Sequence, residues 1–363
     1  MTSRFLLSLA LLVGCSLTNA QPRTKNVVLI TLDGVRWQDL FGGIDSRLMN
    51  EKEAGMDKAA ALREKLWSTD ARQRRERLMP FFWGKLAPRG VVLGNPDRGS
   101  SVKVTNAFRV SYPGYAEILT GRAQDAAIRG NNQIQNPTET VLEFLRRKLK
   151  LERSQVALFG SWETFRWIGE SRPGSIFINA GFQAAEGREV TPRIAELSRI
   201  QFELLTPWDG ARHDHVSFEM ALEYLKTAQP RVLYVALDET DDWAHAKRYD
   251  RVLETLQLTD RWLEKLWNTL ESMPAYRGVT TVVITTDHGR GDTLADFHGH
   301  GARVAGADRI WAAMAGPDTP ALGEAANTEE YFQRDIAPTM LDLLGIDYKE
   351  YSGVAGRPIR PRK

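Results

Sequence analysis

The chain has 363 residues, of which 42% are hydrophobic and 26% are charged, a composition typical of a globular protein. The formal net charge of +2, with no basic stripe interleaved with aromatic residues, argues against a nucleic-acid partner. Cys15 is the only cysteine, so the rest of the chain can contain neither a disulfide framework nor a thiolate metal ligand.

Residues 1–20 have the features of an export signal. Arg4 precedes an apolar run, Phe5–Gly14, that is too short to span a bilayer, and small residues follow up to Ala20. Two processing routes fit: cleavage after Ala20, or lipidation of Cys15 in the sequence LVGC, which resembles a bacterial lipobox. We therefore expect an exported protein, periplasmic or secreted, with a lipid anchor only in the second case and no transmembrane segment.

Apolar strands and amphipathic helices alternate after the signal. Continuous runs rich in β-branched residues indicate strands buried on both faces, at residues 26–34, 156–162, 231–239, 279–289 and 309–317. Apolar residues at helical spacing occupy residues 137–149, 193–205, 215–228, 248–270 and 331–345. The alternation predicts a single α/β domain over residues 21–363, with a largely parallel sheet between helical layers. Residues 36–88, which are charged and helix-rich, predict an insertion or cap on the sheet.

Acidic residues follow three of the predicted strands. Asp33 ends the first, Asp241 comes shortly after the third, and Asp287 ends the fourth. In open α/β sheets ligands bind outside the carboxyl ends of the strands, so these acids are expected to converge. One such acid alone is explained more simply as a helix N-cap, but three of them with histidines nearby indicate a metal site.

Most of the histidines accompany these acids. The chain has six, and four of them lie in these places: His245 four residues after Asp241, His288 directly after Asp287, and His298 and His300 in the glycine-rich DFHGHG. A spacing of four residues places both side chains on one face of a helical turn. Imidazole and carboxylate donors without thiolates suit zinc or manganese rather than calcium.

The stretch SYPG, Ser111–Gly114, follows what reads as a strand and precedes a helical pattern. Ser-x-Pro-Gly is ordinary turn chemistry and by itself requires no function. The alternative is that the turn presents the Ser111 hydroxyl as a nucleophile at the head of a helix. The predicted metal ligands favour this second interpretation, because a cation next to a serine hydroxyl lowers its pKa.

In chain order these motifs resemble the alkaline phosphatase superfamily: an Asp after the first strand, a hydroxyl before a helix, Asp-x-x-x-His, Asp-His-Gly and a later His-Gly. The chain is most similar to the type I phosphodiesterase/nucleotide pyrophosphatase branch, in motif order from LITLDG to HGHG. The resemblance implies a mixed sheet between helical layers and two divalent ions, zinc before manganese. It also implies hydrolysis of a small-molecule phosphate ester through a phosphoserine on Ser111, with diesters favoured over monoesters.

The resemblance further implies how the metal ligands divide. One ion would be held by Asp33, Ser111, Asp287 and His288, and the other by Asp241, His245 and His300. His298 is the alternative to His300, since each is followed by glycine. The spacing of HGARVAG to the next predicted strand favours His300.

The substrate-binding half of the site departs from the family pattern. The phosphodiesterases usually follow the proline with Asn-His, where this chain has Gly114 and Tyr115. In that family the asparagine normally helps to hold a phosphoryl oxygen, and this chain lacks it at that position. Asn131 or Asn132 in RGNNQ is a candidate replacement, and Tyr115 is a candidate substrate contact.

Three other functions stay open. A sulfatase shares the fold, but its motif carries arginine two residues after the proline, where Tyr115 stands here. A phosphomutase would return the phosphoryl group to its substrate, and an exported location argues against that role. A catalytically silent metal- or glycan-binding relative could use the ten tryptophans for stacking, but it has no need of Ser111 and both ligand sets.

Overall fold

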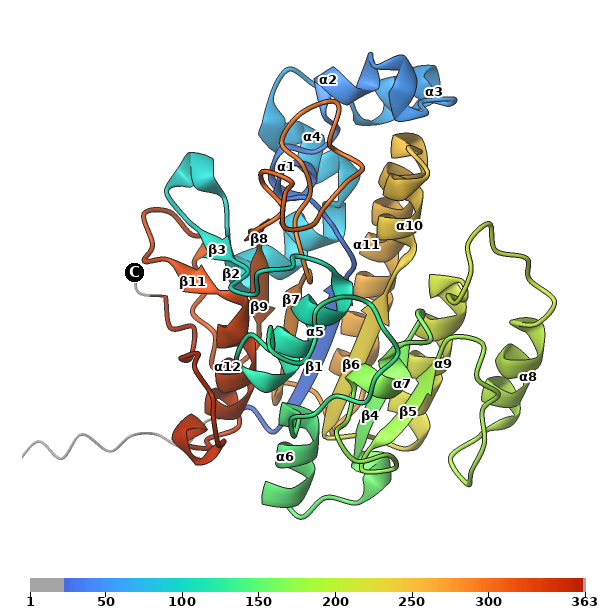
Figure 1. Ribbon diagram of the computed structural model, residues 1–363, viewed down its shortest axis with the longest axis vertical. Coiled ribbons are helices and arrows are strands. Elements are labelled where there is room, and N and C mark those ends of the chain that lie inside the picture. Colours follow the sequence, from blue (N-terminus) through green and yellow to red (C-terminus); the bar gives the residue numbers. More distant parts are fainter. Residues whose placement is uncertain (1–22, 362–363) are drawn as a thin grey trace, which may run out of the picture.

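Eight strands of the computed structural model form one sheet in the order β10-β2-β9-β7-β1-β6-β4-β5 (Figure 1). The structure describes residues 23–361, so residues 1–20 and Cys15, on which the export and lipidation predictions rest, lie outside it. The strands are β1 Asn26–Leu32, β2 Gly90–Leu93, β4 Val156–Gly160, β5 Phe177–Ala180, β6 Val232–Leu237, β7 Thr280–Thr285, β9 Ala312–Ala315 and β10 Gly323–Glu324. A second sheet, in the order β11-β3-β8, consists of β3 Val102–Lys103, β8 Arg309–Ile310 and β11 Tyr331–Phe332.

The central strand β1 pairs in parallel with β6 on one side and β7 on the other. β9 runs antiparallel to both β7 and β2, which makes the large sheet mixed. Along β1, Val28, Ile30 and Leu32 contribute to one hydrophobic core, and Val27 and Leu29 contribute to a second core on the opposite face. Burial on both faces explains the continuous apolar run of this strand. The predicted fold class, a largely parallel sheet between helical layers, is confirmed.

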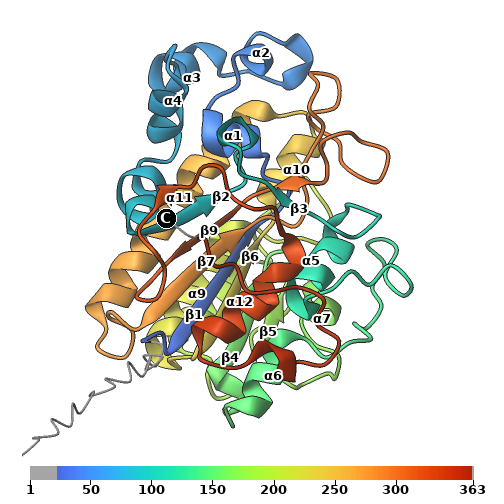
Figure 2. The same cartoon turned by 90° about the vertical axis from the view of Figure 1, so that its left-hand side faces the viewer.

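Helices cover both faces of the sheet (Figures 1 and 2). Residues of α1, α3, α4, α9 and α11 pack into the first core, and residues of α5, α6, α7 and α12 pack into the second. The helices are α1 Trp37–Gly42, α2 Ser46–Met49, α3 Ala59–Leu66, α4 Ala71–Leu78, α5 Ser111–Thr120, α6 Val141–Lys148, α7 Phe165–Ile168, α8 Pro192–Ile200, α9 Asp214–Thr227, α10 Glu239–His245, α11 Tyr249–Ser272 and α12 Ile336–Leu343. No helix within residues 23–361 is both long and apolar enough to cross a membrane.

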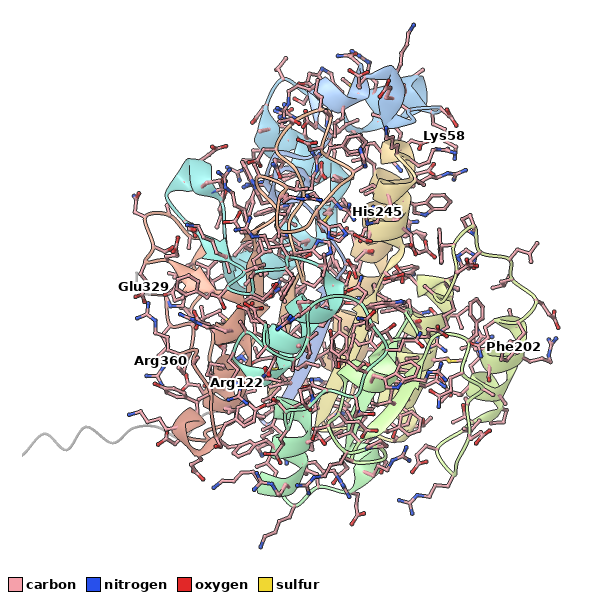
Figure 3. All side chains as sticks on the ribbon, in the orientation of Figure 1. Lys58, Arg122, Phe202, His245, Glu329 and Arg360 are labelled. Atoms are coloured by element: carbon pink, nitrogen blue, oxygen red, sulfur yellow. The ribbon has the colours of Figure 1, made fainter. Side chains whose placement is uncertain are left out.

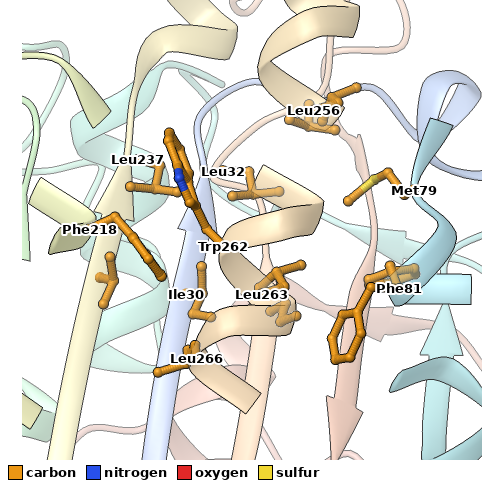
Figure 4. Packing of buried hydrophobic residues seen from close by; sticks show 14 of the residues in the cluster. Ile30, Leu32, Met79, Phe81, Phe218, Leu237, Leu256, Trp262, Leu263 and Leu266 are labelled. Carbon is orange, nitrogen blue, oxygen red and sulfur yellow. The ribbon is translucent and has the colours of Figure 1, made fainter. Parts of the chain in front are cut away.

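The 24-residue helix α11 supports the strand that leads into the predicted site. Its apolar residues recur three and four positions apart, so one face of the helix is buried. Trp262 and Leu263 on that face lie close to Ile30 and Leu32 of β1 (Figure 4). Each large apolar side chain buried in this way stabilises the fold by about 1.5–3 kcal/mol. The packing therefore anchors the end of β1, where Asp33 follows.

Several local predictions are wrong. The segment before Ser111 is not a strand, because β3 ends at Lys103 and residues 104–110 have no regular structure. The strand predicted at residues 309–317 is divided at Trp311 into β8 and β9, which belong to different sheets. The helix predicted at residues 331–345 begins only at Ile336. The sequence does not predict β2 and β5, because four-residue apolar runs carry too little periodicity.

Residues 36–88 contain α1, α2, α3 and α4 with several shorter helical turns and no strand. They lie at the top of Figure 1, beyond the carboxyl ends of the parallel strands. Apolar side chains of α1, α3 and α4, including Leu40, Leu62 and Leu78, join the same core as α11. The helical character agrees with the sequence pattern, and the interpretation of this segment as an insertion stays a prediction.

Gly114 in α5 allows that helix to pack against the end of β7. A Cβ at Gly114 would lie 2.3 Å from the Asp287 carbonyl oxygen, whereas a Cβ at the helical Gly84 has no tertiary contact within 4 Å in residues 23–361. We expect Gly114→Ala to lower the free energy of unfolding by about 1–3 kcal/mol through overpacking. The control Gly84→Ala is expected to leave it unchanged or raise it, because alanine restricts the unfolded chain. Urea denaturation measures the free energy of unfolding of both variants. Equal values for Gly114→Ala and Gly84→Ala would contradict this packing.

Candidate active site

The carboxyl ends of three neighbouring strands carry the site. Asp33 follows β1, Asp287 follows β7, and Asp241 lies in α10 directly after β6. Ser111 is the first residue of α5, and His300 lies in the segment between β7 and β8. The pairing of β1 with both β6 and β7 brings these separate parts of the chain to one edge of the sheet. In Figure 3, His245 is labelled beside α10 at this edge.

Asp33, Asp287 and His288 form a first ligand group, in which one donor atom of each lies within 4.8 Å of the others. The His288 Nε2 is 3.4 Å from Asp33 Oδ1 and 3.3 Å from Asp287 Oδ2. All three side chains are at most 1% exposed. The Ser111 Oγ lies 3.5 Å from the same nitrogen of His288, so the predicted nucleophile borders this group.

Asp241, His288 and His300 form a second ligand group, defined by the same 4.8 Å limit. The His245 Nε2 lies 3.1 Å from Asp241 Oδ2 and 2.9 Å from the His300 Nε2. The rings of His288 and His300 are stacked with their centroids 3.8 Å apart. All seven predicted metal ligands thus converge. His288, which the resemblance assigns to one ion, belongs to both groups.

The first group has the chemistry of a cation site. Within residues 23–361, Asp33 Oδ1 and Asp287 Oδ2 are buried without a hydrogen-bond partner, an arrangement that is costly for a carboxylate. Burial, with repulsion from Asp287, raises the pKa of Asp33 well above its ordinary value. Burial, with repulsion from Asp241, raises the pKa of Asp287 to about 7. A divalent cation would offset this negative charge, and oxygen and nitrogen donors without sulfur fit zinc or manganese.

Asp241 differs from the other two acids because Arg290 contacts it. The Arg290 Nη2 donates to Asp241 Oδ1, and its Nε and Nη1 donate to the carbonyl oxygens of Gly34 (2.9 Å) and His298 (2.7 Å). Burial opposes ionisation of Asp241, but Arg290 and His245 hold its pKa well below the usual range. Arg290 therefore connects Asp241 in α10 with the turn after β1 and with the segment that carries His298. The sequence carries no signal for this role except that Arg290 directly follows Asp-His-Gly.

Gly34 makes the approach of Arg290 possible. Its φ is 59°, a left-handed conformation that favours glycine, and a Cβ would lie 2.6 Å from the Arg290 Nη2. Two further side chains support the strand ends without any signal in the sequence. The Thr240 Oγ1 donates to the Asp33 carbonyl oxygen (2.6 Å), and the Gln333 Nε2 donates to the Thr286 carbonyl oxygen (3.1 Å).

The two candidate metal ligands His300 and His298 differ in their contacts. The His300 Nδ1 donates to the Arg109 carbonyl oxygen (3.1 Å), which leaves Nε2 directed at the second group. Burial lowers the pKa of His300 to about 4, which keeps the ring neutral, as a metal ligand must be. His298 belongs to neither group within the described part of the chain, and its ring contacts Phe297. The geometry favours His300 as the ligand.

Tyr115 is not placed for the substrate contact expected from the sequence. Its side chain is fully buried, and its hydroxyl donates to Asp33 Oδ2 (2.9 Å). The helix α5 directs this side chain toward the sheet, so the structure offers no support for the predicted substrate contact, which stays a prediction. Tyr115 instead orients a predicted metal ligand, as the hydrogen-bonding neighbours of such ligands commonly do.

The two candidate substrate-binding asparagines are exposed beside the nucleophile helix. The Asn131 Oδ1 accepts a hydrogen bond from the backbone nitrogen of Tyr112 (2.9 Å), one residue after Ser111. Asn132 follows directly and is exposed as well. Asn131 thus lies at the N-terminal turn of α5, within the surroundings of Ser111, and its role toward substrate stays a prediction.

The sequence matches the type I phosphodiesterase / nucleotide pyrophosphatase family over residues 27–303. The chain therefore belongs to this family, which confirms the resemblance found in its motifs. The matched range includes Ser111 and every residue of the two ligand groups. No curated protein sequence matches the chain at a significant level.

Solved structures of the alkaline phosphatase superfamily share the fold. Wild-type alkaline phosphatase PafA has a TM-score of 0.57 at 13% identity, covering 94% of this chain and 98% of that protein. BT1596, a 2-O GAG sulfatase, has a TM-score of 0.56 at 16% identity, covering 94% and 73%. The lipoteichoic acid synthase LtaP from Listeria monocytogenes has a TM-score of 0.54 at 13% identity, covering 90% and 73%. Family and fold together indicate a phosphoester hydrolase of this superfamily.

The paired histidines allow a direct test of the ligand assignment. We expect His300→Ala to remove most of the metal affinity of the second group, because the ring nitrogen is lost and Asp241 loses a partner. His298→Ala is expected to keep more of the affinity, because its side chain belongs to neither group within residues 23–361. Metal content after equilibrium dialysis, measured by elemental analysis, compares the two variants. A larger loss in His298→Ala would reverse the assignment.

Proposed function

We propose that the protein is an exported, metal-dependent hydrolase of small-molecule phosphate esters, with phosphodiesters favoured over monoesters. One observation carries the proposal: the Ser111 Oγ lies 3.5 Å from His288 Nε2, beside two buried carboxylate oxygens without partners in residues 23–361. Family membership supports the preference for diesters. The proposal that the protein is exported rests on the sequence of residues 1–20 alone.

Two divalent ions, zinc or second to it manganese, would be held by the two ligand groups together with Ser111 and His245. When bound, such ions supply positive charge that lowers the pKa of a serine hydroxyl and offsets the charge of phosphoryl oxygens. The protein holds the ligands in place: His288 belongs to both groups, and the Tyr115 hydroxyl donates to Asp33 and orients it. Because the site histidines serve as ligands, we assign no histidine as general base.

The N-terminal turn of α5 is suited to an anionic group. The helix begins at Ser111 and runs for ten residues, so its dipole favours a phosphoryl group at this end. Asn131 uses its Oδ1 to accept from Tyr112, which leaves its amide nitrogen for a phosphoryl oxygen. We assign Asn131, with Asn132 beside it, to the substrate side of the site.

The reaction would proceed in two displacements at phosphorus. The Ser111 Oγ forms a bond to phosphorus while the bond from phosphorus to the leaving alcohol oxygen breaks, and the hydroxyl proton passes to solvent. The departing alcohol oxygen takes a proton from solvent. A water molecule then attacks the phosphorus, the Oγ–phosphorus bond breaks, and a proton of that water returns to Ser111 as the product leaves, a phosphate monoester when the substrate is a diester. Serine phosphorylation is therefore an obligatory step of this proposal.

Substitution of Ser111 tests the nucleophile. Ser111→Ala removes both the attacking oxygen and a predicted metal contact, so turnover should fall by several powers of ten. Ser111→Thr keeps a hydroxyl and should retain part of the activity. If the serine served only the turn, Ala would cost about 1 kcal/mol of stability and leave turnover nearly intact. Acid trapping of a labelled phosphoryl group, followed by peptide mapping, locates the intermediate, and a label elsewhere would refute the assignment.

A substrate panel tests the reaction class. After chelation and dialysis, we expect little turnover of aryl phosphodiesters, because the buried carboxylates lack their counter-charge, and recovery on addition of zinc or manganese. Aryl monoesters and phosphonates should react more slowly, and aryl sulfates least. Calcium serves as the control cation, because imidazole ligands suit it poorly. Faster sulfate than phosphate hydrolysis would favour a sulfatase, and full activity without metal would refute the proposal.

A further inference from the structure

Arg109 connects the nucleophile to the second ligand group through its main chain. It stands two residues before Ser111 with a φ of 53°, a left-handed conformation that is uncommon for residues other than glycine. In this conformation its carbonyl oxygen lies 3.1 Å from the His300 Nδ1. Its guanidinium lies 3.8 Å from Asp308 and is partly exposed. The main chain of Arg109, and not its charge, makes the contact with the site.

A buried hydrogen-bond network holds the segment before Ser111 in place. The Arg109 backbone nitrogen donates to the Asn106 Oδ1 (2.8 Å), while the backbone nitrogen and Nδ2 of Asn106 donate to Glu117 Oε2 (2.8 and 3.0 Å). The Thr105 Oγ1 donates to Glu117 Oε1 (2.7 Å). Glu117 is fully buried and belongs to α5, the helix that begins at Ser111. The left-handed turn is thus tied to the nucleophile helix.

We propose that Arg109 is a positioning residue whose left-handed main chain fixes the ring of His300 relative to Ser111. A carbonyl oxygen only accepts hydrogen bonds, so this contact places the proton of His300 on Nδ1 and leaves the lone pair on Nε2. That nitrogen faces the second group, 3.8 Å from Asp241 Oδ1 and 2.9 Å from the His245 Nε2. The inference rests on the proposed function, because it assumes that the second group holds a cation.

Two substitutions at one position separate the main chain from the guanidinium. Arg109→Gly and Arg109→Val both delete the charge, but glycine adopts the left-handed conformation freely and a β-branched residue does not. We expect zinc affinity and turnover of an aryl phosphodiester to stay close to wild type in Arg109→Gly. In Arg109→Val the zinc affinity of the second ligand group should fall by about 10- to 100-fold, as for lost hydrogen-bonding partners of metal ligands. Equal affinities in the two variants would overturn the inference.

Two further measurements keep the test decisive if Arg109→Val does not fold. In zinc-loaded wild-type protein, ¹⁵N NMR of the histidine rings should show His300 protonated at Nδ1 and ligated through Nε2, and ligation through Nδ1 would overturn the inference. Asn106→Ala removes the acceptor for the Arg109 N–H and should weaken zinc binding, but not in a His300→Ala background. An equal loss in that background would overturn the inference as well. Wild-type protein that binds neither zinc nor manganese would instead refute the proposed function.

Discussion

Buried negative charge at the carboxyl edge of the sheet is the constraint on which the rest of this site depends. Asp33 and Asp287 are almost fully buried, and each keeps one oxygen without a partner in residues 23–361. Removing an ionised carboxylate from water costs several kcal/mol unless another charge or a set of donors compensates. The parallel pairing of β1 with its neighbours forces these acids together, because successive strand ends meet at one edge. The cations of the proposed function would offset this buried negative charge.

The surroundings of the acids show partial compensation by the protein itself. Arg290 contacts Asp241 and two loop carbonyl groups, and Tyr115 donates to the second oxygen of Asp33. These contacts are possible because backbone can approach closely at Gly34 and Gly114, where a Cβ would overlap neighbouring atoms. Compensation is uneven: the pKa of Asp241 is lowered, while that of Asp33 is raised. Within residues 23–361, the protein itself thus leaves one oxygen of Asp33 and one of Asp287 without a partner.

The predicted nucleophile and the predicted metal ligands belong to one connected network. Ser111 borders His288, whose ring stacks on His300, and His300 in turn bonds to the main chain just before Ser111. Glu117 of α5 accepts a hydrogen bond from the Asn106 backbone nitrogen and so ties this segment to the helix that begins at Ser111. A hydroxyl that must attack in line gains from such a closed arrangement, because small displacements in an active site are costly. The exposed Asn131 contacts this network through the backbone nitrogen of Tyr112, and its role toward substrate stays a prediction.

Local sequence patterns by themselves determine much of this protein. Continuous apolar runs predict β1, β4, β6 and β7, and the acids and histidines behind them predict the ligands, because strand ends and short motifs are properties of neighbouring residues. Only the tertiary structure decided that His288 belongs to both ligand groups, that Arg290 connects Asp241 with the carbonyl groups of Gly34 and His298, and that Tyr115 faces Asp33. It also divided residues 309–317 between two sheets. These features depend on the direction of side chains and on contacts between distant segments, and neither leaves a local signal in the sequence.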